Sequence, residues 1–184
     1  RYAKIYVSIL EEADRAPMQL ARLQHLMGQP AAVIATLKTL GERNPAALPL
    51  AAPLMVEAAA ATGRTDEVHA LLQAHYAQAP SLDVLESIVA LEAAHEATRP
   101  SARQRYVEHL DKERSLVAAA KWLATEKLEH EEFHPQIQRA LEHAVKPLTR
   151  YRCAACGFEA RQHFWQCPGC QTWDSYPARR VEEL

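Results

Sequence analysis

The sequence predicts an all-α helical solenoid followed by a small C-terminal metal-binding β-hairpin module. Three observations carry this prediction. The first 148 residues are rich in Ala, Leu, Glu and Gln and contain few glycines. A segment recurs in them with a period of thirty-five residues, from Gly28 to Gly63. All four cysteines of the chain lie in two C-x-x-C pairs between Tyr151 and Trp173.

Composition supports the helical part and limits the function. Ala, Leu, Glu and Gln lose little rotamer freedom in a helix, so residues 1–147 should form helices and residues 148–184 a separate domain. The net charge of −2 lacks the basic footprint of a nucleic-acid-binding surface. We find no apolar run of the roughly 18–20 residues that span a bilayer and no secretory signal. We therefore expect a soluble, cytoplasmic region, and because the chain begins with Arg1 we expect an upstream segment.

The repeat predicts a helix-turn-helix unit. The two copies are GQPAAVIATLKTLGERNP, from Gly28 to Pro45, and GRTDEVHALLQAHYAQAP, from Gly63 to Pro80. In each copy the glycine permits a tight turn and the proline stops the second helix. Apolar residues recur in register, at Val33 and Val68 and at Leu37 and Leu72. This is the plan of a tetratricopeptide repeat, with valine where alanine is typical.

The remaining helices follow from the same periodicity. We expect about three repeats, the first truncated, because about three are needed to bury a continuous core. Such a solenoid usually presents a concave face to a peptide or protein, and a simple helical bundle is the alternative. In chain order the expected helices are Tyr2–Ala13 (the second helix of the truncated repeat), Pro17–Met27, 28–45, Ala47–Thr62, 63–80, a helix capped by Ser81 and running to Glu96, Ala102–Lys112 after a break at Arg99–Ser101, and an antiparallel pair at 115–129 and 135–145.

The stretch HEEFHP, from His130 to Pro135, matches the H-E-x-x-H pattern of zinc peptidases. In those enzymes both histidines lie one helical turn apart, and the glutamate activates a zinc-bound water. Here Pro135 disfavours helical geometry at His134, and the stretch falls where the repeat pattern expects a turn. We therefore predict no catalysis here, and the other seven histidines show no ligand spacing. No catalytic residues and no organic cofactor site are predicted.

The cysteines predict a metal site. Cys153-x-x-Cys156-Gly157 and Cys167-Pro-Gly-Cys170 each form a knuckle, and ten intervening residues suffice for a hairpin that brings the knuckles together. Four thiolates in tetrahedral geometry select zinc or iron. A closed tetrathiolate site leaves no open position for water, so the metal is a structural clamp or a one-electron carrier. About thirty-six residues need such a metal to fold.

The aromatic residues around the knuckles should supply the rest of the core of this module. They are Phe158, Phe164, Trp165 and Trp173. Because the linker Lys146–Arg150 is short, we expect some of these rings to dock the module onto the last helices of the repeats.

The segment YRCAACGF…FWQCPGC resembles the rubredoxin type of metal knuckle, and its position behind tetratricopeptide-like repeats resembles the lipopolysaccharide assembly protein B (LapB) family. The resemblance implies Cys153, Cys156, Cys167 and Cys170 as ligands of one metal ion, iron as in rubredoxins or zinc. It also implies a single-pass inner-membrane protein whose transmembrane helix precedes this region on the cytoplasmic side. The chain departs from electron-transfer rubredoxins in its short spacer between the knuckles and in Gln171, which replaces a glycine.

The family resemblance implies a non-enzymatic adaptor. Members promote degradation of the deacetylase LpxC by the membrane protease FtsH, under control of a periplasm-spanning inner-membrane regulator, and so regulate lipopolysaccharide biosynthesis. A homodimer is compatible with this function. The alternatives are a rubredoxin-like electron carrier and a generic peptide-binding repeat protein with a structural zinc ribbon. A nucleic-acid-binding zinc ribbon is disfavoured by the balanced charge of residues 151–184.

Overall fold

The computed structural model describes the backbone of residues 2–94, 99–126 and 132–184, and the side chains from residue 14 onward except those of 95–101 and 127–131. It is mostly helical, with stacked helices and a C-terminal two-stranded hairpin, which confirms the predicted fold class. The helices are α1 (Tyr2–Leu26), α2 (Pro30–Arg43), α3 (Leu48–Thr62), α4 (Thr65–Gln78), α5 (Leu82–Ala94), α6 (Arg99–Leu110), α7 (Leu116–Thr125) and α8 (His134–Val145), with short 3-10 helices η1 (Pro45–Ala47) and η2 (Val181–Glu183) and strands β1 (Tyr151–Arg152) and β2 (Glu159–Ala160).

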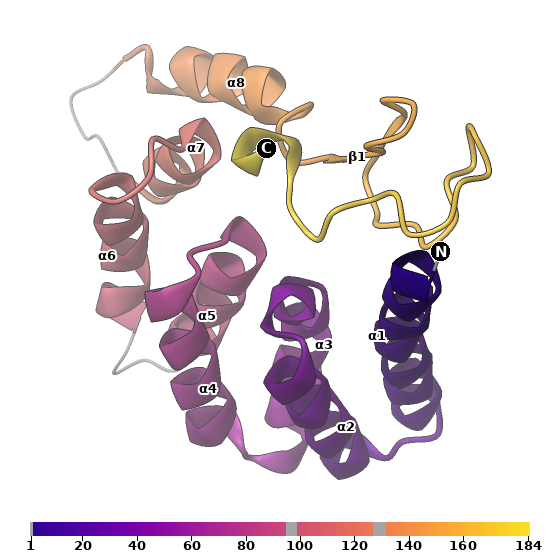
Figure 1. Cartoon of the computed structure of the whole chain (residues 1–184). Coiled ribbons are helices and arrows are strands. Elements are labelled where there is room, and N and C mark those ends of the chain that lie inside the picture. Colours follow the sequence, from indigo (N-terminus) through magenta and orange to yellow (C-terminus); the bar gives the residue numbers. More distant parts are fainter. Residues whose placement is uncertain (1, 95–98, 127–131) are drawn as a thin grey trace.

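The helices succeed one another around an arc, and the C-terminal segment lies across its open side (Figure 1). This segment runs from α8 to the end of the arc formed by α1, and it then returns toward α7. Helices that follow one another in the chain pack together, and α3 also packs on α5. The C-terminal segment therefore reaches both early and late helices.

The thirty-five-residue repeat positions the first two helix pairs as predicted. Gly28 and Gly63 have φ of 69° and 68°, a left-handed conformation that glycine adopts without strain. Pro45 and Pro80 follow the ends of α2 and α4. The residues in register, Val33, Leu37, Val68 and Leu72, are completely buried in the largest core cluster. The repeated sequence pattern therefore corresponds to a repeated packing pattern.

The prediction for the N-terminal helix was wrong. Residues 2–26 form the single helix α1, with Pro17 inside it, rather than two helices separated after Ala13. No glycine lies between Ala13 and Pro17 to end a helix. An interior proline removes one hydrogen bond and bends a helix, and the helical residues on both sides continue it here.

Helix α3 is the central helix of the core. Ala51, Ala52 and Met55 are completely buried. Pro45–Thr62 is the one stretch among the described residues that is long and apolar enough to cross a membrane, and 44% of it is buried in the fold. The expectation that no apolar run is long enough to span a bilayer was wrong for this stretch, in which Glu57 interrupts the apolar residues. Core helices pass the same test of length and composition, and the burial of α3 fits that role.

The later helices agree with prediction except at two starts and at the end of α7. Ser81 Oγ accepts the Val84 amide at 3.3 Å and so caps α5, as predicted. Helix α6 begins at Arg99 and not at Ala102, because proline is well tolerated in a first turn. For the same reason α8 begins at His134, with Pro135 in its first turn, where a turn was expected. The expected end at Glu96 lies outside the described residues. Helix α7 ends at Thr125 and Glu126 has an extended backbone, so the expectation of one helix from 115 to 129 was wrong at its end.

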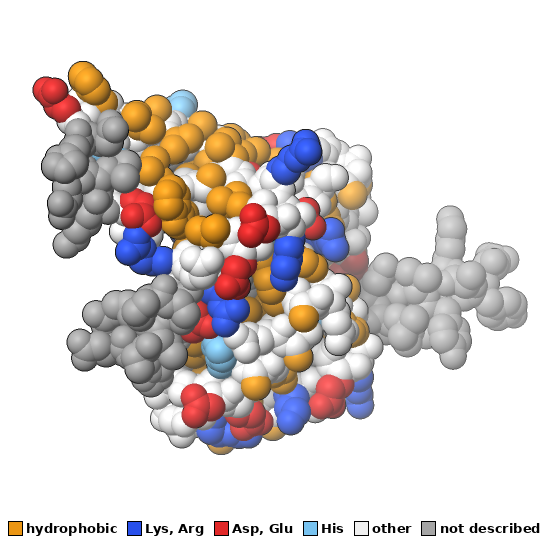
Figure 2. Space-filling model, turned by 90° about the vertical axis from the view of Figure 1, so that its left-hand side faces the viewer, with side chains coloured by type: hydrophobic (Ala, Val, Ile, Leu, Met, Phe, Trp, Pro, Cys, Tyr) orange, Lys and Arg blue, Asp and Glu red, His pale blue; other side chains and the backbone are white. Residues whose placement is uncertain are grey.

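The face formed by the later helices carries a band of hydrophobic side chains (Figure 2). Exposed apolar residues of this region include Leu116, Phe133 and Ile137. Helix α8 is strongly amphipathic, and none of its residues is fully buried. Val145 and Leu148 cover the second core cluster, which includes Leu85 and Val117.

Candidate metal centre

The four cysteines come together at one end of the C-terminal module. Their Sγ atoms all lie within 4.8 Å of one another. The Cys153 and Cys170 sulfurs are 3.8 Å apart, and the Cys156 and Cys167 sulfurs are 3.7 Å apart. Cys153 and Cys167 are buried, whereas Cys156 and Cys170 are exposed. One sulfur of each knuckle therefore faces the module core and the other faces solvent.

Each knuckle is held by its own small hairpin. Strands β1 and β2 pair antiparallel around the first knuckle, and a bridge between Gln166 and Trp173 encloses the second. The sequence predicted a hairpin between the knuckles. The pairing instead surrounds each knuckle, because the tight Cys-x-x-Cys turn itself reverses the chain.

The two turns have the same backbone conformation despite different residues. Gly157 has φ of 77°, and its N–H donates to the Cys153 carbonyl at 2.9 Å. Gln171 has φ of 60°, and its N–H donates to the Cys167 carbonyl at the same distance. Left-handed backbone is strained for a residue with a Cβ atom. The missing glycine therefore changes the strain of the second turn and not its shape.

Polar groups that the sequence analysis did not identify surround the sulfurs. Ser175 Oγ lies 3.2 Å from the Cys153 sulfur, and Thr172 Oγ1 lies 3.2 Å from that of Cys170. The Gly169 N–H donates to the Cys167 sulfur at 3.4 Å. Hydroxyl and amide groups at these positions stabilise thiolates and tune a bound metal. A C-x-x-C-x-T pattern in the sequence offers the only advance signal, at Thr172.

The thiols resist ionising together. Burial raises the pKa of Cys153, but the Ser175 hydroxyl and the Cys156 and Ala155 amides outweigh it and lower that pKa to about 6. The Phe158 amide favours the thiolate of Cys156, but the neighbouring thiols outweigh it and raise that pKa to about 12. Four thiolates this close together repel one another, so they cannot all be ionised without a positive counter-ion.

The donor set fits one metal ion. Four sulfurs from two knuckles, all within 4.8 Å of one another, form a set of thiolate ligands of the kind that soft or borderline cations prefer. Such an ion would supply the positive charge that holds four thiolates together, and the protein would supply all four ligands. Iron and zinc both accept this set of ligands.

The aromatic rings dock the module on the early helices, so the expectation that they contact the last helices was wrong. Trp165 packs against the main core cluster formed by α1 to α5. The Arg15 guanidinium of α1 lies 4.5 Å from the centroid of the exposed Trp173 ring. Phe164 packs inside the module, and Phe158 is exposed. The arc of helices brings α1 next to the module, a closure that local sequence patterns do not contain.

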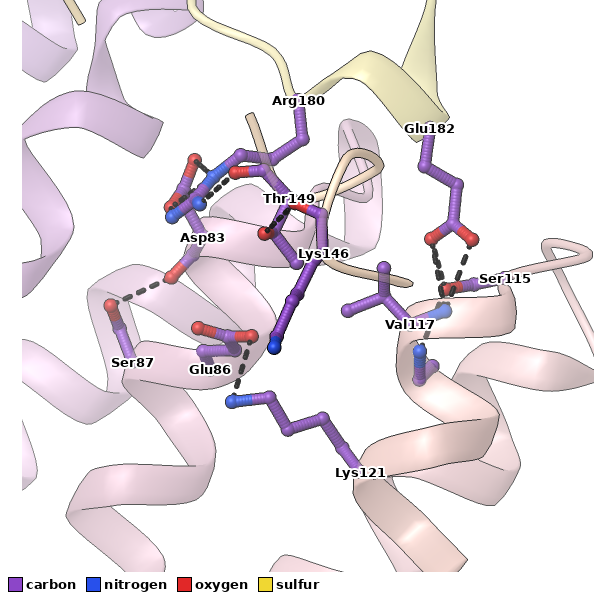
Figure 3. Close-up of polar contacts among 11 residues, drawn as sticks. Asp83, Glu86, Ser87, Ser115, Val117, Lys121, Lys146, Thr149, Arg180 and Glu182 are labelled. Carbon is purple, nitrogen blue, oxygen red and sulfur yellow. Dashed lines mark hydrogen bonds and ion pairs between the residues drawn. The ribbon is translucent and has the colours of Figure 1, made fainter. Parts of the chain in front are cut away.

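A buried ion pair joins the C-terminal tail to α5 (Figure 3). The Arg180 guanidinium donates to both carboxylate oxygens of Asp83, which is 4% exposed, and to the Thr149 carbonyl. The Tyr151 hydroxyl donates to Asp83 at 2.9 Å, and Arg180 covers the Tyr151 ring. Burial and the Asp83 carboxylate raise the pKa of Tyr151. An aspartate among apolar residues in SLDVLESIV was the sequence signal for this pair.

Two glutamates of the tail cap helices. Glu182 accepts the amides of Leu116 and Val117 at 2.6 and 3.0 Å and the Ser115 hydroxyl at 2.6 Å, at the start of α7 (Figure 3). Glu183 accepts the Leu82 amide at 2.8 Å at the start of α5. Burial raises the pKa of Glu183 despite this bond. The tail therefore connects the module to the N-termini of α5 and α7, where carboxylates are favoured by the helix dipole.

The histidines of the helical part act within the fold. Of HEEFHP, His130 and Glu131 lie outside the described residues, and His134 Nε2 lies 3.3 Å from the Leu123 carbonyl oxygen. His69 contacts Glu92 at 2.8 Å, and His109, expected to be exposed or at a cap, is buried beside Tyr76.

The module matches known sequences. Residues 151–176 match the family model described as the Rubredoxin metal binding domain. Lipopolysaccharide assembly protein B of Escherichia coli strain K12 is 42% identical over 41 residues, which are 22% of this chain and 10% of that protein. The same protein from Escherichia coli O157:H7 matches equally. The C-terminal module is similar to the rubredoxin-type part of lipopolysaccharide assembly protein B. The match spans about a tenth of the length of these relatives, and it confirms the predicted relation over the rubredoxin-type module.

Proposed function

We propose that this protein is a non-enzymatic adaptor that regulates lipopolysaccharide biosynthesis by promoting FtsH-dependent proteolysis of LpxC at the inner membrane. In this proposal an upstream transmembrane helix anchors the chain, with the described region on the cytoplasmic side. A periplasm-spanning regulator controls it. Residues 1–147 are the repeat domain and residues 148–184 the metal domain.

The proposal rests on one observation above all, the similarity of the rubredoxin-type module to lipopolysaccharide assembly protein B. The geometry is consistent with it. Four cysteines that all ligate one ion leave no coordination position for a substrate. The module contacts α1, α5 and α7 through Arg15, Asp83 and Ser115. A metal clamp that fixes a composite surface suits binding of proteins better than chemistry.

We further propose that Cys153, Cys156, Cys167 and Cys170 bind one iron or zinc ion whose function is structural. Replacing Cys153 and Cys156 with serine should release the ion and unfold the module, because so small a domain depends on metal for folding free energy. Metal analysis of the purified chain and thermal unfolding check this. Full metal content or an unchanged melting temperature in the double variant would exclude the structural role.

The adaptor function itself is tested by the lifetime of LpxC. In Gram-negative cells that lack their own lipopolysaccharide assembly protein B, the membrane-anchored form of this protein should shorten the half-life of LpxC after translation is stopped. The cysteine double variant should not. An LpxC half-life that is equal with the wild-type protein and with an empty vector would contradict the proposal.

One observation favours an electron carrier as the second candidate. Cys156 and Cys170 are exposed, and exposed ligands shorten the path for an electron from a partner. This candidate requires iron and a reversible change of visible absorbance on reduction. A colourless zinc-loaded protein that supports LpxC turnover fully would eliminate it.

A further inference from the structure

A cavity of about 470 Å³ lies where the helical stack meets the module. The connections from α2 to α3 and from α4 to α5 form one side, and the module forms the other. Its walls are mostly apolar and include Pro45, Ala47, Pro80, Trp165 and Pro177. This volume lies within the range of sites that bind residue-sized or larger groups.

Two carboxylates line this cavity, and one of them is incompletely bonded. Oδ1 of Asp174 is buried and accepts no hydrogen bond from the part of the chain that the structure describes. Its other oxygen, Oδ2, lies 3.9 Å from the Arg15 guanidinium. Asp14 accepts a hydrogen bond from the Asn44 amide. Buried acceptors without a donor are uncommon in native proteins, and Asp174 keeps the capacity to accept one further hydrogen bond.

The other charged groups of the cavity leave it acidic. Arg179, an exposed cation, lines it together with the two carboxylates, so the lining carries an excess of one negative charge. His75 and His163 also line it, and burial lowers the pKa of each, which favours their neutral forms. A cation in this cavity would therefore meet the carboxylates of Asp14 and Asp174.

A second cavity, of about 370 Å³, adjoins the first and has the opposite charge. It is lined by Arg22 and Arg161, neither of which forms an ion pair within the described residues, and by Arg180 and Asp83, which pair with each other. The two cavities share four lining residues, Pro49, Leu50, His163 and Trp165.

The residues between the cavities are held rigidly. The His163 and Trp165 rings pack edge to face with centroids 4.8 Å apart. His163 Nε2 donates to the Tyr176 carbonyl at 3.0 Å, and Trp165 packs against the core of the stack. The acidic and basic cavities therefore keep a fixed separation, and a preformed site loses less affinity to ordering on binding.

We propose that these two cavities bind an extended segment of a partner protein that carries one basic and one acidic side chain. The aliphatic stem of a lysine or arginine lies along the apolar walls of the first cavity, and its cation bonds to Asp174. The acidic side chain bonds to Arg22 and Arg161. This inference rests on the proposed adaptor function and identifies the chemistry of the segment that the adaptor recognises.

Synthetic peptides test the proposal with the metal-loaded 184-residue chain. The probe is a library of capped octapeptides with one lysine or arginine and one glutamate at varied spacing among Ala, Leu and Ser, read by fluorescence polarisation. We expect one spacing to be preferred. Replacing the lysine or the glutamate of that peptide with alanine should weaken binding roughly 10- to 100-fold, as expected for a lost charged hydrogen bond.

Two protein variants assign the charges to the cavities. Asp174→Asn should weaken binding of the selected peptide by a similar factor, and removing the lysine from the peptide should then cost less affinity than it does with the wild-type protein. Arg161→Gln should likewise weaken binding and reduce the affinity lost on removing the glutamate. Asparagine tolerates the left-handed conformation of residue 174, φ 52°, so the backbone is retained. Asp111→Asn and Arg43→Gln, which line neither cavity, are the matched controls.

Absence of any peptide that binds more tightly than about 1 mM, or binding that neither variant nor peptide substitution changes, would overturn the proposal. Its failure is separable from that of the adaptor function. LpxC turnover without peptide binding refutes only this site, and peptide binding without LpxC turnover refutes only the proposed target.

Discussion

Replacing Arg180 with alanine should be among the most destabilising single changes in the C-terminal tail. The substitution leaves the carboxylate of Asp83, 4% exposed, without its cation and retains only the Tyr151 hydroxyl among the partners from the module. The substitution also removes the hydrogen bond from Arg180 to the Thr149 carbonyl. It removes the contact with the Tyr151 ring as well, in which the guanidinium carbon lies 4.8 Å from the ring centroid. Removing one partner of a buried ion pair typically costs about 3–5 kcal/mol.

The free energy of unfolding can be measured for this variant by urea denaturation of the metal-loaded chain, followed by far-ultraviolet circular dichroism. Arg179→Ala is the matched control, because Arg179 is exposed and a surface substitution usually changes stability by less than about 0.5 kcal/mol. Arg180→Lys should give an intermediate loss, since lysine keeps the charge but not the planar fork. A loss for Arg180→Ala within about 1 kcal/mol of the control would refute the assigned role of the ion pair.

Three further changes test other parts of the structure. Gln171→Gly should raise the free energy of unfolding of the metal-loaded module by up to about 1 kcal/mol, and Gly157→Gln should lower it by about 1–2 kcal/mol, because glycine adopts positive φ without the strain that glutamine incurs. The same sign for both changes would be inconsistent with the strain. Glu182→Gln should cost about 1–2 kcal/mol in urea unfolding by weakening the cap of α7, whereas the exposed Glu142→Gln should be neutral. Burial raises the pKa of Glu92, but Arg105 and His69 outweigh it and hold the pKa below its ordinary 4.5. The unfolded chain therefore binds this proton at a higher pH than the folded chain, so the free energy of unfolding falls as the pH drops below about 4.5. Glu92→Gln should make this fall less steep. The same dependence of the free energy of unfolding on pH below about 4.5 in both proteins would argue against the assigned role of Glu92.

The helical half could be predicted because its information is local and repeated. Gly28 and Gly63 fix two turns by their φ, and the buried positions recur with them. Local signals failed where two outcomes were compatible with the same residues. Pro17 lies inside α1, and Pro100 lies in the first turn of α6, because proline both ends helices and occupies their first turns.

The convergence of the cysteines could also be predicted, since C-x-x-C pairs bring thiols together by local turns. The position of the module could not. Its contacts join residues such as Asp83 and Arg180, which lie far apart in the sequence, and they depend on how strongly the arc of helices curves. Curvature is a sum of many small packing angles, so Trp165 reaches the early helices although the linker follows the last one.

The central claim is that a metal-clamped module fixes the composite surface by way of its C-terminal tail. Amide hydrogen exchange tests it most directly, in the metal-loaded chain and in the Cys153→Ser, Cys156→Ser variant. The amides of Leu82 and Val117 bond to Glu183 and Glu182 in the tail. Both amides should exchange faster in the variant, while those of α2, far from the tail in sequence, should keep their protection. Unchanged exchange at Leu82 and Val117 in a variant that has lost its metal would contradict the claim.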